Sequence, residues 1–173
     1  MISNKIDISI VIPYLNGSTL IFSTLTSIAD NLTNSDLQIE VIIANGGDNA
    51  SDKVELTKIV TKFKTKFDII LLEIPDHSMY EGLCNGLKIS RGKIHSYINC
   101  GDGYFNGAFT YAFDALSSGK QDVIFSKRCV RINERFDYGK QRSYQNGRGL
   151  GMMGFGYSKD RNKNVIINEE ESK

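Results

Sequence analysis

The chain has 173 residues, of which 40% are hydrophobic and 24% charged, and its formal net charge is +1 at pH 7. These values predict one soluble globular domain with a buried core, and the near-neutral charge gives no general attraction to nucleic acid. No apolar run approaches the roughly 18 residues that cross a bilayer, and the first residues lack the apolar stretch of a signal peptide. Three cysteines without metal-ligand spacing favour reduced thiols in a cytoplasmic protein.

Strand and helix patterns alternate along the first 126 residues. Short β-branched runs predict strands at residues 8–12, 39–44, 68–74, 94–98 and 122–126. Apolar residues at helical spacing predict helices within residues 16–32, 51–63, 79–90 and 106–116. This alternation predicts a single α/β domain, a three-layer α/β/α arrangement around a mainly parallel sheet.

Polar residues are expected to cap these helices. The candidate N-caps are Asn16 or Ser18, Ser51 or Asp52, and Asn106. Gly92 is placed to end the third helix. In the second helix we expect Val54 to share the buried stripe with Ile59, Val60 and Phe63.

Beyond residue 126 the periodic pattern weakens. Residues 127–148 carry seven basic and two acidic side chains, a net charge of +5, and a glycine-rich piece and a polar tail follow. We therefore predict a core at 1–126, a basic, glycine-rich region at 127–157 and a flexible tail at 158–173. The basic run is suited to an anionic ligand and equally to a solvated loop.

Four loops fall on the predicted carboxyl edge of the sheet, where parallel α/β sheets bind ligands. Each combines a small residue with an amide or carboxylate, and they cover residues 13–17, 45–48, 76–85 and 99–103. Such groups suit a nucleobase edge, ribose hydroxyls or a metal on a diphosphate, although turn chemistry alone explains any one loop. The absence of GxGxxG and GxxxxGK[ST] argues against a dinucleotide-binding Rossmann site and a P-loop triphosphatase.

Four segments carry these loops in order. They are SIVIPYLN at residues 9–16, EVIIANGGDNASD at 40–52, DHSMYEGLCNG at 76–86 and GKIHSYINCGD at 92–102. In order and spacing they resemble family 2 glycosyltransferases: the opening strand with its Pro-x-x-Asn turn, the Asp-Gly-Gly-Ser-Thr-Asp loop, the Asp-x-Gly-Met/Ile-Tyr segment and the "NSGD" variant of the acidic motif. The resemblance covers roughly residues 7–126.

The resemblance implies the GT-A fold and an enzyme of surface polysaccharide synthesis. Its donor would be a nucleoside-diphosphate sugar of the UDP or GDP type, its acceptor a glycan or lipid-linked molecule, and the transfer would invert the anomeric centre. The implied donor-binding residues are Pro13, Tyr14, Asn16, Asn45, Gly47, Asp76, Asn85, Asn99 and Asp102. Among them Asn45 would contact the base, and Asp102 would face the diphosphate through Mg²⁺ or Mn²⁺. Peripheral contact with the inner face of a membrane is a further expectation.

The chain departs from the family pattern at three points. Asn45 stands where the family usually has Asp, and the acidic motif keeps one carboxylate, Asp102. The chain ends about 70 residues after Asp102, so we expect it to lack much of the acceptor half. Glu134 and Asp137 are weak candidates for the catalytic base, with solvated charges as the alternative. An inactive nucleotide-sugar-binding module or partner subunit is the second hypothesis, and an unrelated doubly wound protein the third.

Overall fold

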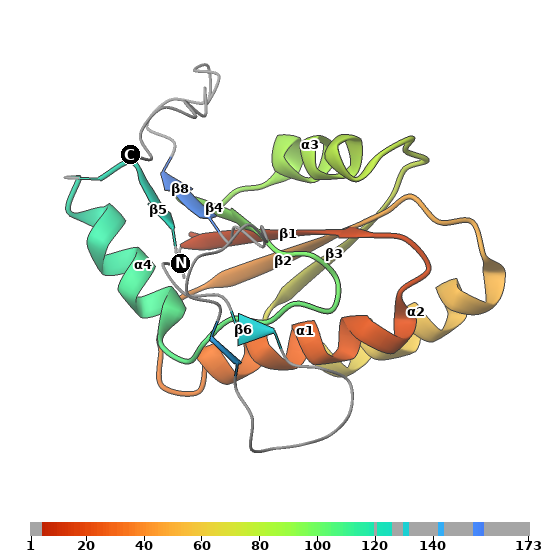
Figure 1. Ribbon diagram of the computed structural model, residues 1–173, viewed down its shortest axis with the longest axis horizontal. Helices are drawn as coiled ribbons and strands as arrows, with labels where there is room; N and C mark the ends of the chain where they lie inside the picture. The colour runs from red at the N-terminus through yellow and green to blue at the C-terminus, as the bar shows by residue number, and fades with distance from the viewer. Residues whose placement is uncertain (1–4, 120, 126–129, 132–141, 144–153, 158–173) are drawn as a thin grey trace.

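The computed structural model describes residues 5–119, 121–125, 130–131, 142–143 and 154–157 (Figure 1). Each predicted strand and helix is present, with its ends shifted by a few residues. The helices are α1 (Ser18–Asn31), α2 (Ala50–Phe63), α3 (Met79–Ile89) and α4 (Ala108–Ser117). The strands are β1 (Ile8–Tyr14), β2 (Ile39–Asn45), β3 (Asp68–Glu73), β4 (Ile94–Tyr97), β5 (Val123–Phe125), β6 (Val130–Arg131), β7 (Arg142–Ser143) and β8 (Gly154–Tyr157).

The main sheet has the strand order β3-β2-β1-β4-β8-β5. Strands β3, β2, β1 and β4 are parallel neighbours, whereas β8 is antiparallel to both β4 and β5. Helix α3 covers one face of the sheet, and α1 and α2 lie on the other (Figure 1). The predicted three-layer, mainly parallel α/β architecture is therefore confirmed. Strand β8 comes from the glycine-rich segment in which the sequence pattern predicted no strand.

Strands β1 and β2 form the centre of the core. Every residue of both strands is buried, as expected for parallel strands covered by helices on both faces. Ile21, Leu25 and Ile28 of α1 are fully buried against them and belong to the same hydrophobic cluster. In contrast, β3 lies at the edge of the sheet and none of its residues is fully buried.

Two glycines let other segments lie unusually close to β1. A Cβ atom at Gly86 would lie 2.4 Å from Cγ1 of Val11, so α3 can pack on β1 only because this position has no side chain. A Cβ atom at Gly92 would lie 2.5 Å from the backbone nitrogen of Ser9. Gly92 does not end α3, because the helix stops at Ile89 with Ser90 as its C-cap. That prediction was wrong, and close approach to β1 is what this glycine permits.

The predicted caps were also wrong. The side chain of Asn49 caps α2 by accepting from the backbone N–H groups of Ser51 and Asp52. Helices α1 and α4 begin after Gly17 and Gly107, neither of which offers a side-chain cap, so Asn16, Ser18 and Asn106 are not caps. Several turn residues could cap each helix, and sequence alone does not choose among neighbours one or two positions apart.

Val54 does not join the buried stripe of α2. Its side chain is 57% exposed, whereas Leu56, Ile59, Val60 and Phe63 are buried. Leu56 and Val60 lie one turn apart on the helix face that meets α1 and the sheet, and Val54 falls outside that face.

A buried carboxylate joins the first three strands at the amino edge of the sheet. Glu40 of β2 is fully buried, and its Oε1 accepts from Ser9 Oγ and from the backbone N–H of Arg91, both at 2.5 Å. Arg91 Nε donates to Glu40 Oε2 at 2.7 Å, and the guanidinium also contacts Asp68 of β3. The hydrogen bond to Glu40, followed by that to Asp68, raises the pKa of Arg91. The fold thus satisfies this buried charge completely.

Replacing Arg91 with Met should destabilise the protein, because the substitution leaves the buried Glu40 carboxylate without its cation. We expect a loss of about 1–3 kcal/mol in urea denaturation, below the usual cost of breaking a buried pair because the Arg91 side chain is 48% exposed. Lys58→Met, which removes the exposed pair with Glu55, is the control and should change stability by under about 0.5 kcal/mol. Equal stability of the two variants would contradict this account of Glu40.

Candidate functional site

The carboxyl ends of β1, β2 and β4 meet at one edge of the sheet (Figure 1). Tyr14, at the end of β1, is in register with Asn45, at the end of β2. On the other side of β1, the turn that holds Asp102 follows β4. Asn45 and Asp102, two of the residues predicted to bind the donor, therefore lie on either side of the end of β1.

Asn45 is the most unusual side chain at this edge. It is 3% exposed, and its Oδ1 accepts from the backbone N–H of Gly47 at 2.9 Å. Among the described residues, its Nδ2 is the one buried side-chain nitrogen or oxygen without a hydrogen-bond partner. Folded proteins rarely leave such a group unpaired, so this buried amide stands out among the polar groups of the edge.

Asn16 and Gly47 lie beside Asn45, as the sequence predicted. A Cβ atom at Gly47 would lie 2.7 Å from Asn16 Oδ1 and 3.1 Å from Asn45 Oδ1, so the two amides converge over this glycine. Asn16 adopts a left-handed conformation with φ of 47°, which asparagine tolerates better than most residues. Pro13, three residues before Asn16, is buried in β1.

Asp76 packs into the space beside two glycines. Cβ atoms at Gly46 and Gly82 would lie 2.5 Å and 2.7 Å from its carboxylate, so neither position accepts a side chain without displacing it. The side chain of Asp76 consequently lies between the end of β2 and the start of α3. Asn85 is half-buried further along α3.

The turn after β4 is held in place by a polar ladder on α1, formed by Thr24, Ser27 and Asn31. Their side chains accept from the backbone N–H groups of Gly101 at 2.9 Å and Tyr104 at 3.2 Å in the loop after β4, and of Ala108, the first residue of α4, at 3.0 Å. Thr24 Oγ1 also donates to the backbone oxygen of Asp102 at 2.8 Å. This ladder fixes the backbone that carries the exposed Asp102.

The turn itself is tight. The backbone N–H of Asp102 donates to the oxygen of Asn99 at 3.0 Å, and Gly101 takes a φ of 97° that side chains rarely adopt. Between them, the Cys100 thiol donates to the Gly17 oxygen at 3.5 Å. Burial, and then the charges of Asp52 and Asp102, raise the pKa of Cys100 to about 11. The thiol is therefore protonated at neutral pH and unsuited to act as a nucleophile.

Asp52 is a residue of this edge that the sequence reading missed. Its carboxylate accepts from Tyr14 Oη at 2.5 Å and from the backbone N–H of Ser18 at 3.1 Å, linking α2 to the end of β1 and the start of α1. Burial, together with the bond to Asp52, raises the pKa of Tyr14. Partial burial opposes the charge on Asp52, but these hydrogen bonds outweigh it and lower the pKa of that carboxyl. Tyr14 and Asp52 are 38 positions apart, so no local sequence pattern indicates that they are hydrogen-bonded.

The described residues offer little to a resident metal ion. Within them, no group of three or more His, Cys, Asp or Glu side chains could hold one. At the carboxyl edge, Asp102 contributes one exposed carboxylate after β4, and Asp48 another in the loop after β2. This donor set fits a cation that takes most of its ligands from a diphosphate and water, as Mg²⁺ commonly does.

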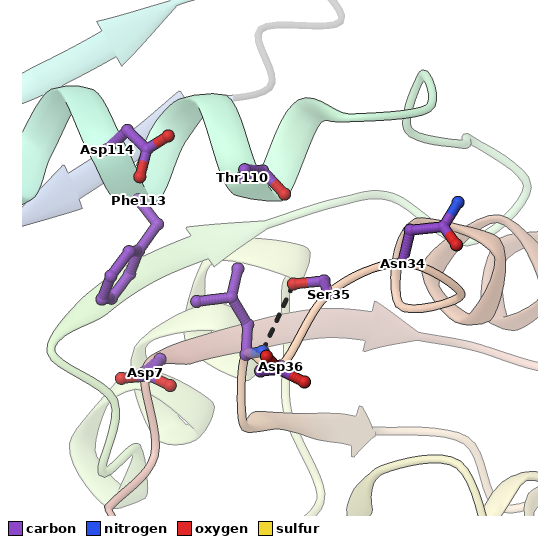
Figure 2. Close-up of a pocket in the computed structure, with 8 residues that line it drawn as sticks. Asp7, Asn34, Ser35, Asp36, Thr110, Phe113 and Asp114 are labelled. Atoms are coloured by element: carbon purple, nitrogen blue, oxygen red, sulfur yellow. Dashed lines mark hydrogen bonds between the residues drawn. The ribbon is translucent and has the colours of Figure 1, made fainter.

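A hollow of about 300 Å³ lies at the opposite, amino edge of the sheet (Figure 2). It is lined by residues 34–37, by Asp7 and by α4 residues that include Phe113 and Asp114. Asp7 is engaged there by Lys93 at 3.6 Å and by the backbone N–H of Gln38. None of the predicted donor-binding residues lines this hollow. The contacts of Asp7 described above join the strands and loops of this edge to one another.

The candidate bases Glu134 and Asp137 lie outside the described residues, as does most of the basic stretch. Within the part of the chain that is described, no helix is long and apolar enough to cross a membrane.

Thr24→Val should loosen the turn that carries Asp102, because it removes two hydrogen bonds from a fully buried side chain while nearly conserving its volume. We expect the free energy of unfolding to fall by about 1–3 kcal/mol in chemical denaturation. Thr57→Val on the exposed face of α2, where the hydroxyl bonds only to its own helix backbone, should stay within about 0.5 kcal/mol of the parent. Similar losses in both variants would argue against a special role for the ladder.

The fold matches solved structures of glycosyltransferases. TarS residues 1–349 from S. aureus match with a TM-score of 0.60 and 17% identity, over 68% of this chain and 34% of that chain. The same protein in complex with UDP-GlcNAc gives 0.58 and 17%, over 68% and 33%. PcManGT, a mannosyltransferase from Pyrobaculum calidifontis in complex with GDP-Man and Mn²⁺, gives 0.58 and 13%, over 69% and 34%.

The comparison establishes the fold of the chain. This chain covers about a third of the length of these structures. No protein-family model and no curated protein matches the sequence. Identities this low show a shared architecture, so the sheet and its helices are those of the GT-A fold found in these glycosyltransferases.

Proposed function

We propose that the chain binds a nucleoside-diphosphate sugar at the carboxyl edge of its sheet and forms the donor half of a glycosyltransferase. The observation that carries this proposal is the placement of Asn45, with its buried and unpaired amide nitrogen, and Asp102 on opposite sides of the end of β1 in a GT-A sheet. By resemblance the donor is of the UDP or GDP type. TarS and PcManGT, which share the fold, bind UDP-GlcNAc and GDP-Man.

Six of the nine predicted donor-binding residues take a stated role in this proposal. Asn45, with Asn16 and Gly47 beside it, would meet the nucleoside, and Asp102 the diphosphate. Pro13 and Tyr14 are buried, so they would shape the site from beneath. The remaining donor-binding candidates are Asp76, Asn85 and Asn99.

The proposed reaction is displacement at the anomeric carbon. An acceptor hydroxyl on a glycan or lipid-linked molecule forms the new bond, the bond to the diphosphate breaks, and the configuration inverts. A divalent cation, Mg²⁺ or Mn²⁺, would neutralise charge on the leaving diphosphate. Glu134 and Asp137 are the candidates for the base that takes the hydroxyl proton. The basic residues around them would suit a diphosphate or an anionic lipid-linked acceptor.

A role in surface polysaccharide synthesis, at the inner face of a membrane, follows from the resemblance. The alternative is an inactive nucleotide-sugar-binding module or partner subunit. We expect the core at 1–126 to hold the donor, the region at 127–157 to contribute to the acceptor side, and the tail at 158–173 to remain outside the site.

Asp102→Asn should abolish hydrolysis of the sugar donor in the presence of Mn²⁺, with UDP-GlcNAc and GDP-Man as the probes. It should also weaken nucleotide binding by about tenfold, because a carboxylate no longer meets the diphosphate through the cation. Asp114→Asn, on α4 at the opposite edge, is the matched control and should change neither value. Binding without hydrolysis by the parent protein would favour the inactive module, and no nucleotide binding at all would refute the proposal.

The protein without nucleotide should bind Mn²⁺ weakly, with a Kd on the order of 1 mM or above, because no group of three or more His, Cys, Asp or Glu side chains among the described residues could hold the ion. Adding a nucleoside diphosphate should tighten binding, since the phosphate oxygens complete the coordination. Calorimetric titration of Mn²⁺ into the two forms measures this difference. Tight, nucleotide-independent binding would contradict this expectation.

A further inference from the structure

Helix α3 presents apolar side chains to solvent on the face that points away from the sheet. The two residues that the helix buries are glycines, Gly82 and Gly86, and they define its inner side. Tyr80, Cys84 and Leu87 are spaced at helical intervals, so they form one stripe on the opposite side. Tyr80 is 70% exposed and Leu87 39%, and Cys84 is exposed as well. An amphipathic helix that covers a sheet ordinarily turns its apolar stripe inward.

Exposed apolar side chains gather on this helix. Twelve large hydrophobic side chains are exposed in the described part of the chain, and four of them belong to the eleven residues of α3: Met79, Tyr80, Leu87 and Ile89. Apolar residues scattered singly over a surface need no explanation, whereas a group of them on one element indicates a contact surface.

The sheet beneath α3 is also incompletely covered. Among the described elements, α3 is the only helix on its face of the sheet, whereas α1 and α2 share the other face (Figure 1). A Cβ atom at Gly82 would lie 3.7 Å from Cβ of Ala44, so Ala44 faces α3, and its partner Leu72 in β3 faces the same side. Helix α3 packs on β1 and β2, and Leu72 at the edge stays half-buried. Parallel sheets are usually covered on both faces, so this side lacks part of a layer.

The charged residues of α3 complement one another in an antiparallel pair of such helices. Glu81 and Lys88 are exposed and lie two turns apart on the same flank of the apolar stripe. In two copies related by a two-fold axis near Cys84, this flank of one helix meets the same flank of the other, running in the opposite direction. Glu81 of each copy then lies opposite Lys88 of the other. Helices packed in the same direction would instead set like charges against each other.

We propose that two copies of this chain pair through the outer faces of α3, antiparallel and related by a two-fold axis near Cys84. Tyr80 and Leu87 of each copy form the apolar centre, and the pairs of Glu81 and Lys88 border it. A second copy fits this face because a two-fold interface must complement itself, in charge as well as in hydrophobicity. The formal net charge of +1 leaves little repulsion between copies. One pair of helices buries less area than a standard interface, so we expect a Kd on the order of 10 µM.

Sedimentation equilibrium of the full chain, from about 1 to 200 µM, tests the pairing. The mass should rise with concentration from one 19.3 kDa chain towards two. Tyr80→Lys should weaken association at least about tenfold, because it places a charge in the apolar centre. Tyr111→Lys on α4 is the matched control, the same change at a tyrosine that is 69% exposed, and should associate like the parent. Thermal melting establishes that both variants are folded.

Exchange of the two charges tests the antiparallel arrangement. Lys88→Glu should weaken association at low salt, because each Glu81 then faces a glutamate. Adding Glu81→Lys to the same chain restores opposite charges across the interface and should recover most of the affinity. Glu81 also accepts from the backbone N–H of His77, but the Ser78 cap of α3 remains in the double variant, and thermal melting checks that it is folded.

Cys84 reports the position of the two-fold axis. Packed helices have axes about 8–10 Å apart, so the two Cys84 thiols come within reach of a short bismaleimide. We expect this reagent to join two parent chains covalently and to leave the Cys84→Ser variant as single chains.

Each measurement has a result that would overturn the proposal. A monomer at every concentration, or equal association of the Tyr80→Lys and Tyr111→Lys variants, would rule out pairing through α3. A folded double charge variant that associates no better than Lys88→Glu would rule out the antiparallel arrangement, and cross-linking that persists in Cys84→Ser would rule out an axis near Cys84. These outcomes do not involve nucleotide, so the pairing and the proposed donor site can each fail while the other stands.

Discussion

Complete burial of β1 is the constraint on which the rest of the structure depends. All seven of its residues are buried, and it pairs in parallel with β2 on one side and β4 on the other. The ladder with β4 ends at Val11, where the backbone N–H of Ile98 donates to the Val11 oxygen. Pro13, which has no N–H to donate, comes after this point and costs the ladder nothing. Because β4 turns away before β1 ends, the chain after it forms the loop that flanks the candidate site.

Strand β2 buries two polar side chains, and they differ in whether their hydrogen bonds are satisfied within the protein. Glu40, at the amino edge, has its carboxylate bonded by Ser9 and Arg91. Asn45, at the carboxyl edge, has one buried donor without a partner. A fully satisfied buried group contributes to a unique fold, whereas an unsatisfied one lowers stability until a ligand supplies its partner. The carboxyl edge is thus where the local rule of satisfying every buried polar group is relaxed, as is typical of functional sites.

Most of the architecture could be predicted from the sequence because the buried strands and amphipathic helices have strong periodic signals. Strand β8 escaped prediction because its glycines carry no hydrophobic pattern, and its strand partners are defined only by the assembled sheet. At the site, Asn45 and Asp102 could be placed at strand ends from the sequence. The bond between Tyr14 and Asp52, the ladder on α1 and the unpaired nitrogen of Asn45 could not, since each depends on contacts between segments far apart in the chain.

The ladder of Thr24, Ser27 and Asn31 has a consequence for the dynamics of the loop that carries Asp102. Two amides of that loop and the first amide of α4 are bonded to one face of a helix whose other face lies in the core. The loop cannot open far without breaking these bonds, so it belongs to the same cooperative unit as α1 and should share the slow amide exchange of the core. A loop already ordered in this way loses little conformational entropy when a ligand arrives, which leaves more of the contact energy for affinity.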